Sequence, residues 1–433
     1  MHSIQYKQLH VRPAASLKGT LVPPASKSYS ARAVLAASLA PGTSTIENVA
    51  DSHNVKAMIE CCRALGAVMT PDGPGRLRVA GVARPRDGVI LSPGNSGIVL
   101  RLLMGAAARS RGVTFASPYT ESLGRRGNSE MVEALRALGV VVTAEGADGR
   151  LPITLDGAGA HGGEVGISGR RSSQFLSGLL YLGGLLDEPL AVHVTDELKA
   201  WPMVRTTLAV LARAGVAAEA GADLLTYLVR PGGGFQPAAY ACGSDPASVA
   251  ALLAIATAVE SDVEIRSHGL EELGGVLDHL RAVGARIDED GTTLRVRGGG
   301  PLRARDFDGS QAPDAVLPLA ALAAHAEGTS RFTNIEHIRY KECDRISDFR
   351  RELTRVGIDS GETRDELIVH GSPGGVPGGV TVTSHYDHAV VMAMSLVALR
   401  SRRGLTIGDP QYVAQTYPAF FEDLRRLGAT VAA

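Results

Sequence analysis

The stretch MVEALRALGVVV, residues 131–142, contains an amphipathic helix that stops at Gly139 and passes at once into a β-branched run. Glycine after the last helical turn supplies the left-handed backbone that ends the helix. One such helix–glycine–strand phrase is weak evidence for a fold, but this one recurs. It returns as CCRALGAVM (61–69), LAVLARAGVAA (208–218), VLDHLRAVGARI (276–287), FRRELTRVGIDS (349–360) and FFEDLRRLGATV (420–431), with the glycines 69 to 76 residues apart.

This spacing predicts an internal repeat of about 70 residues. Each helix is followed by segments typical of strands, so a unit holds roughly two helices and several strands. Such segments include RLRVAG (76–81), LPITLDG (151–157), TLRVRGG (293–299) and ELIVHGS (366–372). Units repeated in this way, three to a domain, predict two similar α/β domains.

The border between the two domains is expected in the glycine- and proline-rich stretch at 231–246. A strand-like segment, YKQLHVRP, precedes the first full repeat, so we expect the chain to start in the second domain and cross early. The expected domains are residues 21–239 and residues 1–20 with 240–433. A cleft between domains is the usual place for a small-molecule site, and we expect the active site there.

The composition indicates an ordinary globular protein, with 433 residues, 45% hydrophobic, 21% charged and formal net charge −1. Aromatic residues are only 4%, and there is no lysine–arginine tract, so a nucleic-acid partner is not expected. The N-terminus lacks the apolar core of a signal peptide, and the run at 389–399 is too short to span a bilayer. Four cysteines without C-x-x-C spacing fit free thiols in a reducing cytoplasm.

Several segments combine cationic or hydroxyl side chains with a helix start, where unpaired N–H groups attract anions. In SKSYSAR (26–32), Lys27 and Ser28 open a helix and Arg32 lies one turn inside it. A serine-capped helix with solvated basic residues would explain the same segment equally well. Similar starts occur at SPGNSGIVLRLL (92–103), GRRGNSE (124–130) and SGRRSSQF (168–175), although the first reads by itself as a simple turn.

Segments of the second half bring acidic residues to similar places. Asp314 enters a very apolar helix in SQAPDAVLPLA (310–320), either as a cap or as a carboxylate poised to act as a general base. The segment at 335–353 brings Lys341, Glu342 and Arg345 together, which solvated helix charges would also explain. Asp387 and His388 directly precede a further apolar helix, and the residue after them is Ala389.

These segments together predict a small, multiply anionic substrate bound between the domains. The sequence has no phosphate-binding P-loop, no G-x-G-x-x-G after a strand, no metal-ligand pattern and no G-x-S-x-G elbow. We therefore expect no bound metal and no cofactor.

With these motifs in this order, the chain resembles the EPSP synthase (3-phosphoshikimate 1-carboxyvinyltransferase) family of the enolpyruvyl transferase fold. The resemblance covers nearly the full length through SKSYSAR, GNSG, RRSSQF, PDAVLPLA, RYKECDR, YDH and TYPAFF. It implies an inside-out α/β barrel architecture in which each of two domains has three βαβαββ repeats. The UDP-GlcNAc enolpyruvyl transferases are similar in fold, but their cysteine-bearing loop has no match in ESLGRRGN (121–128).

The resemblance also implies roles for individual residues. Shikimate 3-phosphate would contact Lys27 and, through its carboxylate, Ser28 and Arg32. Phosphoenolpyruvate would lie on the side of Arg126 and Arg345. The implied catalytic residues are Lys27, Asp314, Lys341 and Glu342, to which we add His337, at a position where the family often has Asn. The implied substrate-binding residues are Ser28, Arg32, Asn95, Gly97, Arg126, Ser172, Ser173, Gln174 and Arg345. To these we add Arg171 as an extra nearby cation and His388, which keeps the family turn.

Two positions depart from the family pattern on the phosphoenolpyruvate side. The family has Arg where this chain has Ala389, and Lys where it has Gln415. Two lost charge-assisted contacts cost about 3–6 kcal/mol, or roughly 10²- to 10⁴-fold in affinity. On the shikimate phosphate side, Ala200 stands where the family usually has Ser, and Arg170 and Arg171 are extra cations nearby.

These losses favour a hypothesis in which a divergent paralogue acts on shikimate 3-phosphate, or a close analogue, without phosphoenolpyruvate. The phosphate is allylic, so a base that removes a proton from carbon 6 could expel it by 1,4-elimination. The product would be a dihydroxycyclohexadiene carboxylate of a specialised pathway. Asp314, Glu342, Lys27 and His337 are the candidate bases.

Genuine EPSP synthase activity is the alternative, favoured by the retained Lys27, Asn95, Arg126, Asp314, Glu342 and Arg345. A non-catalytic binding paralogue is a remote third reading, because an idle site has no reason to keep so many ionisable residues. Under each reading the protein is expected to be cytoplasmic and monomeric, with a small anionic substrate and no nucleic-acid or membrane partner.

Overall fold

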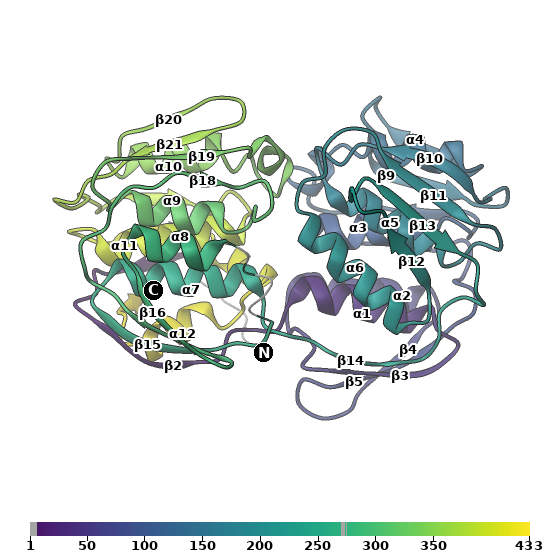
Figure 1. Cartoon of the computed structure of the whole chain (residues 1–433), viewed down its shortest axis with the longest axis horizontal. Helices are drawn as coiled ribbons and strands as arrows, with labels where there is room; N and C mark the ends of the chain where they lie inside the picture. Colours follow the sequence, from purple (N-terminus) through teal and green to yellow (C-terminus); the bar gives the residue numbers. More distant parts are fainter. Residues whose placement is uncertain (1–6, 270–272, 274) are drawn as a thin grey trace. The chain divides into compact units, whose positions relative to one another are not determined.

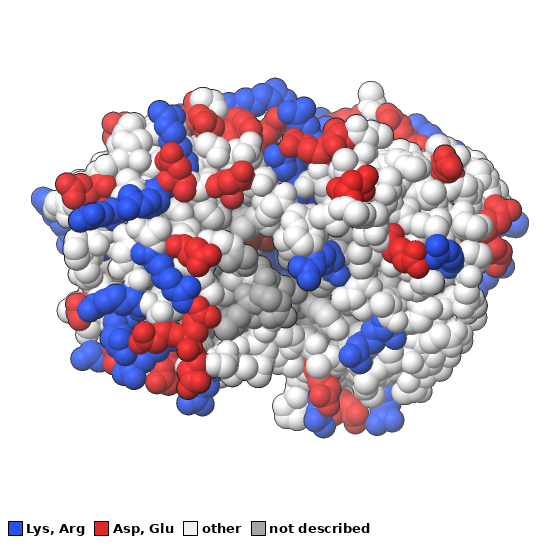
Figure 2. Space-filling model, viewed as in Figure 1, with Lys and Arg blue, Asp and Glu red and all other residues white. Residues whose placement is uncertain are grey.

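The computed structural model describes residues 7–269, 273 and 275–433. The chain divides into two compact units, which we call unit 1 (residues 1–24 and 243–433) and unit 2 (residues 25–242). Figure 1 shows that each unit contains both helices and sheets. Figure 2 shows charges of both signs interspersed over the visible face of each unit.

The helices of unit 2 alternate between fully buried and amphipathic. Those buried along nearly their whole length are α1 (Lys27–Ser38), α3 (Gly97–Ala106) and α5 (Ser173–Gly183). The amphipathic ones, which carry the repeated phrase, are α2 (His53–Ala64), α4 (Ser129–Ala137) and α6 (Trp201–Arg213). A short 3-10 helix, η1 (Leu123–Arg125), precedes α4.

Unit 1 repeats this alternation. Its buried helices are α7 (Pro246–Ala258), α9 (Val316–Ala323) and α11 (His388–Arg400). The amphipathic ones are α8 (Val276–Val283), α10 (Ser347–Arg355) and α12 (Phe420–Arg426), and the 3-10 helices are η3 (Glu336–Tyr340) and η4 (Pro410–Gln415). Because helices α7, α9 and α11 are apolar all round, they can be stable only inside a shell of other elements.

Within the described residues, the strands form six sheets of four strands each. Those of unit 2 are β14 (Ala239–Ala241)-β3 (Gly42–Glu47)-β5 (Leu77–Gly81)-β4 (Val68–Pro71), β6 (Ile90–Leu91)-β7 (Val113–Phe115)-β9 (Arg150–Asp156)-β8 (Val141–Glu145) and β10 (Gly163–Ile167)-β11 (Leu190–Val194)-β13 (Thr226–Arg230)-β12 (Ala217–Ala220). Those of unit 1 are β2 (Leu17–Leu21)-β15 (Ser261–Arg266)-β17 (Thr293–Arg297)-β16 (Arg286–Asp290), β18 (Phe307–Asp308)-β19 (Thr329–Thr333)-β21 (Leu367–His370)-β20 (Ser360–Glu362) and β22 (Thr381–Thr383)-β23 (Leu405–Gly408)-β1 (Gln8–Val11)-β24 (Val431–Ala432).

Each of these sheets has the same pairing, in which a parallel first pair is followed by two antiparallel pairs. In one sheet, for example, β6 runs parallel to β7, while β9 runs antiparallel to both β7 and β8. In Figure 1, strands of unit 1 such as β2, β15, β18 and β19 pass outside helices α7 and α9. The expected α/β fold of βαβαββ repeats is confirmed.

The chain passes between the units at two points. At each point a strand pairs in the sheet of one unit, and the next helix along the chain belongs to the other unit. Strand β2 pairs in parallel with β15 of unit 1, although the next helix along the chain is α1 of unit 2. Strand β14 pairs in parallel with β3 of unit 2, although it leads into α7 of unit 1. The unit boundaries therefore fall after these strands, at 24/25 and 242/243, a few residues beyond the positions expected from the sequence.

The repeated glycines end their helices as expected. Gly66, Gly139, Gly215, Gly284, Gly357 and Gly428 all have positive φ, between 78° and 124°. A side chain in that region of backbone space is disfavoured, which explains why the phrase keeps glycine.

Two other glycines allow buried helices α3 and α5 to touch. A Cβ on Gly105 would overlap the carbonyl oxygen of Gly178, and one on Gly178 would overlap that of Arg101. We expect Gly178→Ala to lower the free energy of unfolding of unit 2 by about 1–3 kcal/mol, because the helices must move apart. Urea unfolding would measure this. Gly232→Ala, where a Cβ meets nothing within 4 Å, is the matched control, and equal midpoints for the two variants would contradict the expectation.

Candidate active site

The start of α1 holds the first predicted cluster. Ser26 caps the helix by accepting from the Tyr29 amide at 3.1 Å. Arg32 is completely buried one turn later, where its Nη1 donates to the Ser28 hydroxyl at 2.7 Å and its Nε donates to Thr207 at 2.7 Å. The structure therefore brings Ser28 and Arg32 together, beside the half-buried Lys27 that opens the helix. A guanidinium and a hydroxyl at a helix start form a suitable carboxylate site.

The start of α3 brings Asn95, Gly97 and Arg126 together. The buried Arg126 guanidinium lies so close to Gly97 that an added Cβ would be 2.5 Å from its Nη1. The Asn95 side chain accepts from the Leu123 amide at 3.2 Å, which joins this helix start to η1. The absence of a side chain at Gly97 therefore leaves the room that Arg126 occupies.

Arg101 is a residue that the sequence reasoning did not place in the site. It is buried within α3, with its guanidinium 4.4 Å from the centre of the Phe175 ring. Its Nη1 donates to Ser172 at 3.1 Å and to Gln174 at 3.0 Å, and its Nε donates to Asn128 at 3.2 Å. The Arg101 guanidinium thus holds two side chains, Ser172 and Gln174, that the sequence predicts to bind substrate. The available signal was a single arginine within the apolar helix GIVLRLLMGA, since a buried charge must be paired.

We expect Arg101→Met to lower the free energy of unfolding of unit 2 by about 3 kcal/mol, because several buried polar partners lose their donor. It should also weaken binding of shikimate 3-phosphate, the ligand expected from the sequence, about tenfold, since Ser172 and Gln174 are no longer held. Urea unfolding and calorimetric titration would measure the two effects. Arg84→Met is the control, because that side chain is 69% exposed. Unchanged binding in a folded Arg101→Met protein would show that Arg101 does not organise the site.

The starts of α5 and α6 complete this half-site. Ser172 caps α5 by accepting from the Gln174 amide, and Ser173 donates to the Ala200 carbonyl, both at 3.3–3.4 Å. The predicted extra cations are engaged by carboxylates, because Arg171 lies 3.2 Å from Glu130 and Arg170 lies 3.4 Å from Glu197. We call the helix starts of α1, α3, α5 and α6, with Arg32, Arg101 and Arg126, the anion half-site.

Unit 1 builds its half-site around Arg345. This side chain is 1% exposed and forms ion pairs with Asp314 at 2.7 Å, Asp387 at 2.7 Å and Glu342 at 3.3 Å. Burial by itself lowers the pKa of Arg345, but the three carboxylates together raise it well above its ordinary value. The group is therefore a permanent cation that fixes the positions of Asp314 and Glu342. We call these residues, with Asp387 and His388, the carboxylate half-site.

The start of α11 explains the arrangement of Asp387. Its side chain caps the helix by accepting from the Ala389 amide at 2.8 Å, and it also accepts from Nε and Nη2 of Arg345. Ala389 is buried at the first turn, where the family pattern has Arg. Gln415, where the pattern has Lys, is also buried and donates to the Tyr386 carbonyl at 2.9 Å. Neither position supplies a positive charge.

The remaining predicted residues lie in the segment that leads to Arg345. His337 is buried on η3, and Lys341 follows the end of that helix in a half-buried position. Cys343 lies 3.6 Å from Asp387, and burial raises the pKa of its thiol well above the ordinary value. The thiol therefore stays protonated and is a poor nucleophile.

Comparison with known proteins identifies the family of this chain. The family model described as EPSP synthase (3-phosphoshikimate 1-carboxyvinyltransferase) matches residues 11–424. The chain belongs to the EPSP synthase family. It is 46% identical to a 3-phosphoshikimate 1-carboxyvinyltransferase of Burkholderia pseudomallei, over 99% of this chain and 96% of that protein. It is 40% identical to the protein of the same name from Deinococcus radiodurans, over 97% and 95%.

Solved structures show the same fold for EPSP synthase family members. The EPSP synthase of Acinetobacter baumannii superimposes with a TM-score of 0.80 and 24% identity, covering 99% of this chain and all of that one. The view of this chain as a divergent paralogue needs correction, because relatives at 46% and 40% identity carry the name of the synthase itself. In the described part of the chain, none of the helices has the length and apolar character needed to cross a bilayer.

Proposed function

We propose that this enzyme is a 3-phosphoshikimate 1-carboxyvinyltransferase, which transfers the enolpyruvyl group of phosphoenolpyruvate to the 5-hydroxyl of shikimate 3-phosphate. The observation that carries this proposal is the 46% identity, over nearly the whole of both chains, to a relative of that name. The sequence alone favoured phosphate elimination, with synthase activity as the alternative, and the proposal reverses that preference. The relatives give no support to a lyase.

The anion half-site suits the phosphorylated substrate. The carboxylate of shikimate 3-phosphate would bind Ser28 and Arg32, and the Arg32 guanidinium is already oriented by Thr207. Its phosphate would bind Ser172 and Ser173 at the start of α5, where helix N–H groups favour negative charge. The two ends of one small molecule would thus be held by two helix starts. Phosphoenolpyruvate would lie beside Arg126.

The carboxylate half-site suits the proton transfers. In the proposed mechanism Asp314 takes the proton of the 5-hydroxyl as its oxygen bonds to carbon 2 of phosphoenolpyruvate. Glu342 or Lys27 supplies a proton to the methylene carbon, giving a tetrahedral intermediate. Loss of the phosphate, together with a proton from the new methyl group, then restores the double bond. Arg345 contributes by holding Asp314 and Glu342 in place.

Phosphate elimination without phosphoenolpyruvate remains the second candidate, because one observation favours it. Ala389 and the engaged amide of Gln415 leave two family positions without charge, and Arg345 is already paired with three carboxylates. Fewer cations are then available to a second anionic substrate than the family pattern provides.

Phosphorus and proton NMR of the purified enzyme with shikimate 3-phosphate, with and without phosphoenolpyruvate, separate the candidates. We expect inorganic phosphate only when phosphoenolpyruvate is present, together with the vinyl proton signals of an enolpyruvyl ether. Phosphate and a diene appearing without phosphoenolpyruvate would establish elimination and overturn the proposal. Binding of shikimate 3-phosphate with no turnover under either condition would favour the non-catalytic reading.

A further inference from the structure

Gln415 lies at the end of η4, and its buried amide contacts two groups beside the start of α11. Its Nε2 donates to the Tyr386 carbonyl at 2.9 Å, and its Oε1 lies 3.4 Å from Nδ1 of His388. A backbone carbonyl can only accept a hydrogen bond, so the first contact fixes which end of the amide is the nitrogen. The atom that faces His388 is therefore the amide oxygen.

An amide oxygen cannot donate, so the ring nitrogen that faces it must carry a proton. A second oxygen reinforces this assignment, because Oδ1 of Asp387 also lies 3.4 Å from Nδ1. That oxygen already accepts from the Ala389 amide at 2.8 Å and from Arg345 at 3.1 Å. Nδ1 thus faces two acceptors. In the neutral ring the lone pair then belongs to Nε2.

We propose that Gln415 is a positioning residue that holds His388 in the Nδ1–H tautomer, so that Nε2 serves as an acceptor in the carboxylate half-site. In that tautomer Nε2 can accept a hydrogen bond from an O–H group and cannot donate one. A lysine at position 415 would do the opposite, because an ammonium group has three donors and no acceptor. The glutamine therefore changes the chemistry presented by His388 as well as removing a charge.

The same amide also holds a strained turn. His385 and Tyr386 both have left-handed backbones, with φ of 51° and 63°, which non-glycine residues rarely adopt. The turn is tied at one end by His385 to Glu352 at 2.9 Å and at the other by Gln415 to the Tyr386 carbonyl. A test of the tautomer must therefore separate the role of Oε1 from the role of Nε2.

Nitrogen-15 NMR of the full-length protein with labelled histidine makes this separation, because protonated and unprotonated ring nitrogens give distinct signals. His388→Gln identifies the signals of His388. Wild type and Gln415→Glu, which keeps an oxygen facing Nδ1, should both show a protonated Nδ1 and an unprotonated Nε2. Gln415→Met, which keeps the volume and loses both polar atoms, should shift His388 toward a mixture of tautomers. Gln411→Met on the same 3-10 helix is the control and should leave the wild-type pattern.

A wild-type Nε2–H pattern would overturn the proposal. So would an unchanged pattern in Gln415→Met, because Asp387 alone would then set the tautomer. These spectra need no substrate, so they stand or fall separately from the proposed function. The catalytic consequence does rest on that function, and there we expect Gln415→Met to lower kcat about tenfold while KM for shikimate 3-phosphate stays within about twofold.

Discussion

Replacing Arg345 by methionine is expected to lower the free energy of unfolding of unit 1 by about 3–5 kcal/mol, because a buried charge pair loses one partner. Asp387 has 0% exposure and Glu342 has 10%, so neither can be rehydrated cheaply. Activity should fall at least roughly 10²-fold in any folded fraction, since Asp314 and Glu342 are no longer held in position. Urea unfolding followed by steady-state kinetics would measure both effects.

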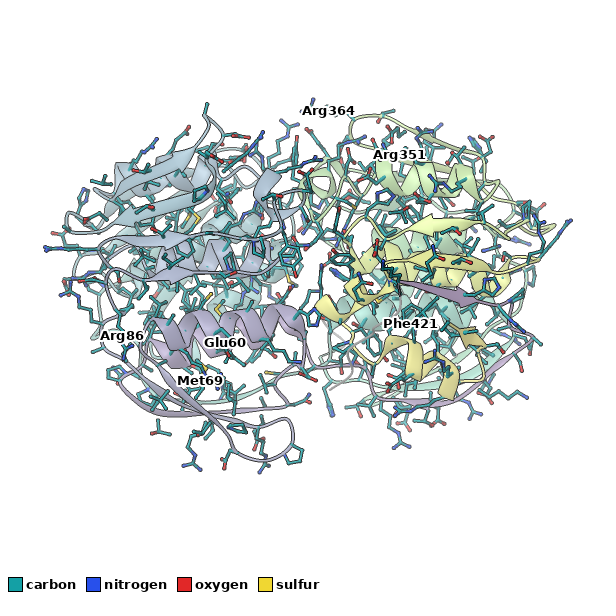
Figure 3. The ribbon with its side chains drawn as sticks, turned by 180° about the vertical axis from the view of Figure 1, so that it is seen from behind. Glu60, Met69, Arg86, Arg351, Arg364 and Phe421 are labelled. Carbon is teal, nitrogen blue, oxygen red and sulfur yellow. The ribbon has the colours of Figure 1, made fainter. Side chains whose placement is uncertain are left out.

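Two further variants sharpen this test. Arg345→Lys keeps the charge, but a compact ammonium cannot reach three carboxylates as a guanidinium does, so its stability should fall between those of wild type and Arg345→Met. Arg351→Met on α10 is the control, because Arg351 is 58% exposed at the position labelled in Figure 3. We expect this control to change stability by less than about 0.5 kcal/mol. Equal losses from Arg345→Met and Arg351→Met would contradict the role given to Arg345.

Replacing Asp314 by asparagine is expected to lower kcat by roughly 10²- to 10⁴-fold, the usual contribution of a general base. The folded state should be affected little, since Asp314 is 36% exposed and Arg345 keeps its pairs with Asp387 and Glu342. Binding of shikimate 3-phosphate, measured by calorimetry, should stay within about threefold, because the anion half-site is unchanged.

Asp290→Asn on β16, an exposed carboxylate at a strand end, is the control for this change. A kcat within about threefold of wild type for Asp314→Asn would exclude Asp314 as the base. Loss of shikimate 3-phosphate binding with kcat retained would instead assign it a purely binding role.

Much of the fold could be predicted because its signals are local. The sequence around Gly139, and each of its repeats, predicts a helix, the end of that helix and the following strand within a dozen residues. The pairing of β2 with β15 could not be predicted in the same way, because it joins residues 17–21 to residues 261–265. Neither strand has a sequence feature that indicates which strand it pairs with. The unit boundary therefore fell a few residues later than the composition suggested.

For the site, too, local features could be predicted from the sequence, whereas contacts between distant residues could not. The helix starts that carry Ser28 and Ser172 are visible in the sequence, because hydroxyl and cationic side chains stand directly before apolar runs. The ion pairs of Arg345 are not visible, since its partners come from positions 314, 342 and 387 and meet only in the folded unit. A residue expected to bind substrate thus also holds three carboxylates in place. Likewise, Gln415 could be noted as a missing cation, but its contact with Tyr386 could not be foreseen.

The place of strand β1 has a consequence for how the chain is made. Residues 8–11 lie between β23 and β24, so this strand pairs with residues 405–408 and 431–432, which leave the ribosome much later. Residues 25–242, in contrast, contain every strand of their own sheets. A nascent chain can therefore finish unit 2 while β1 waits unpaired, with Leu9 and Val11 unable to bury their side chains. Chains stalled near residue 400 should then yield a protease-resistant unit 2 and a unit 1 that is still digested.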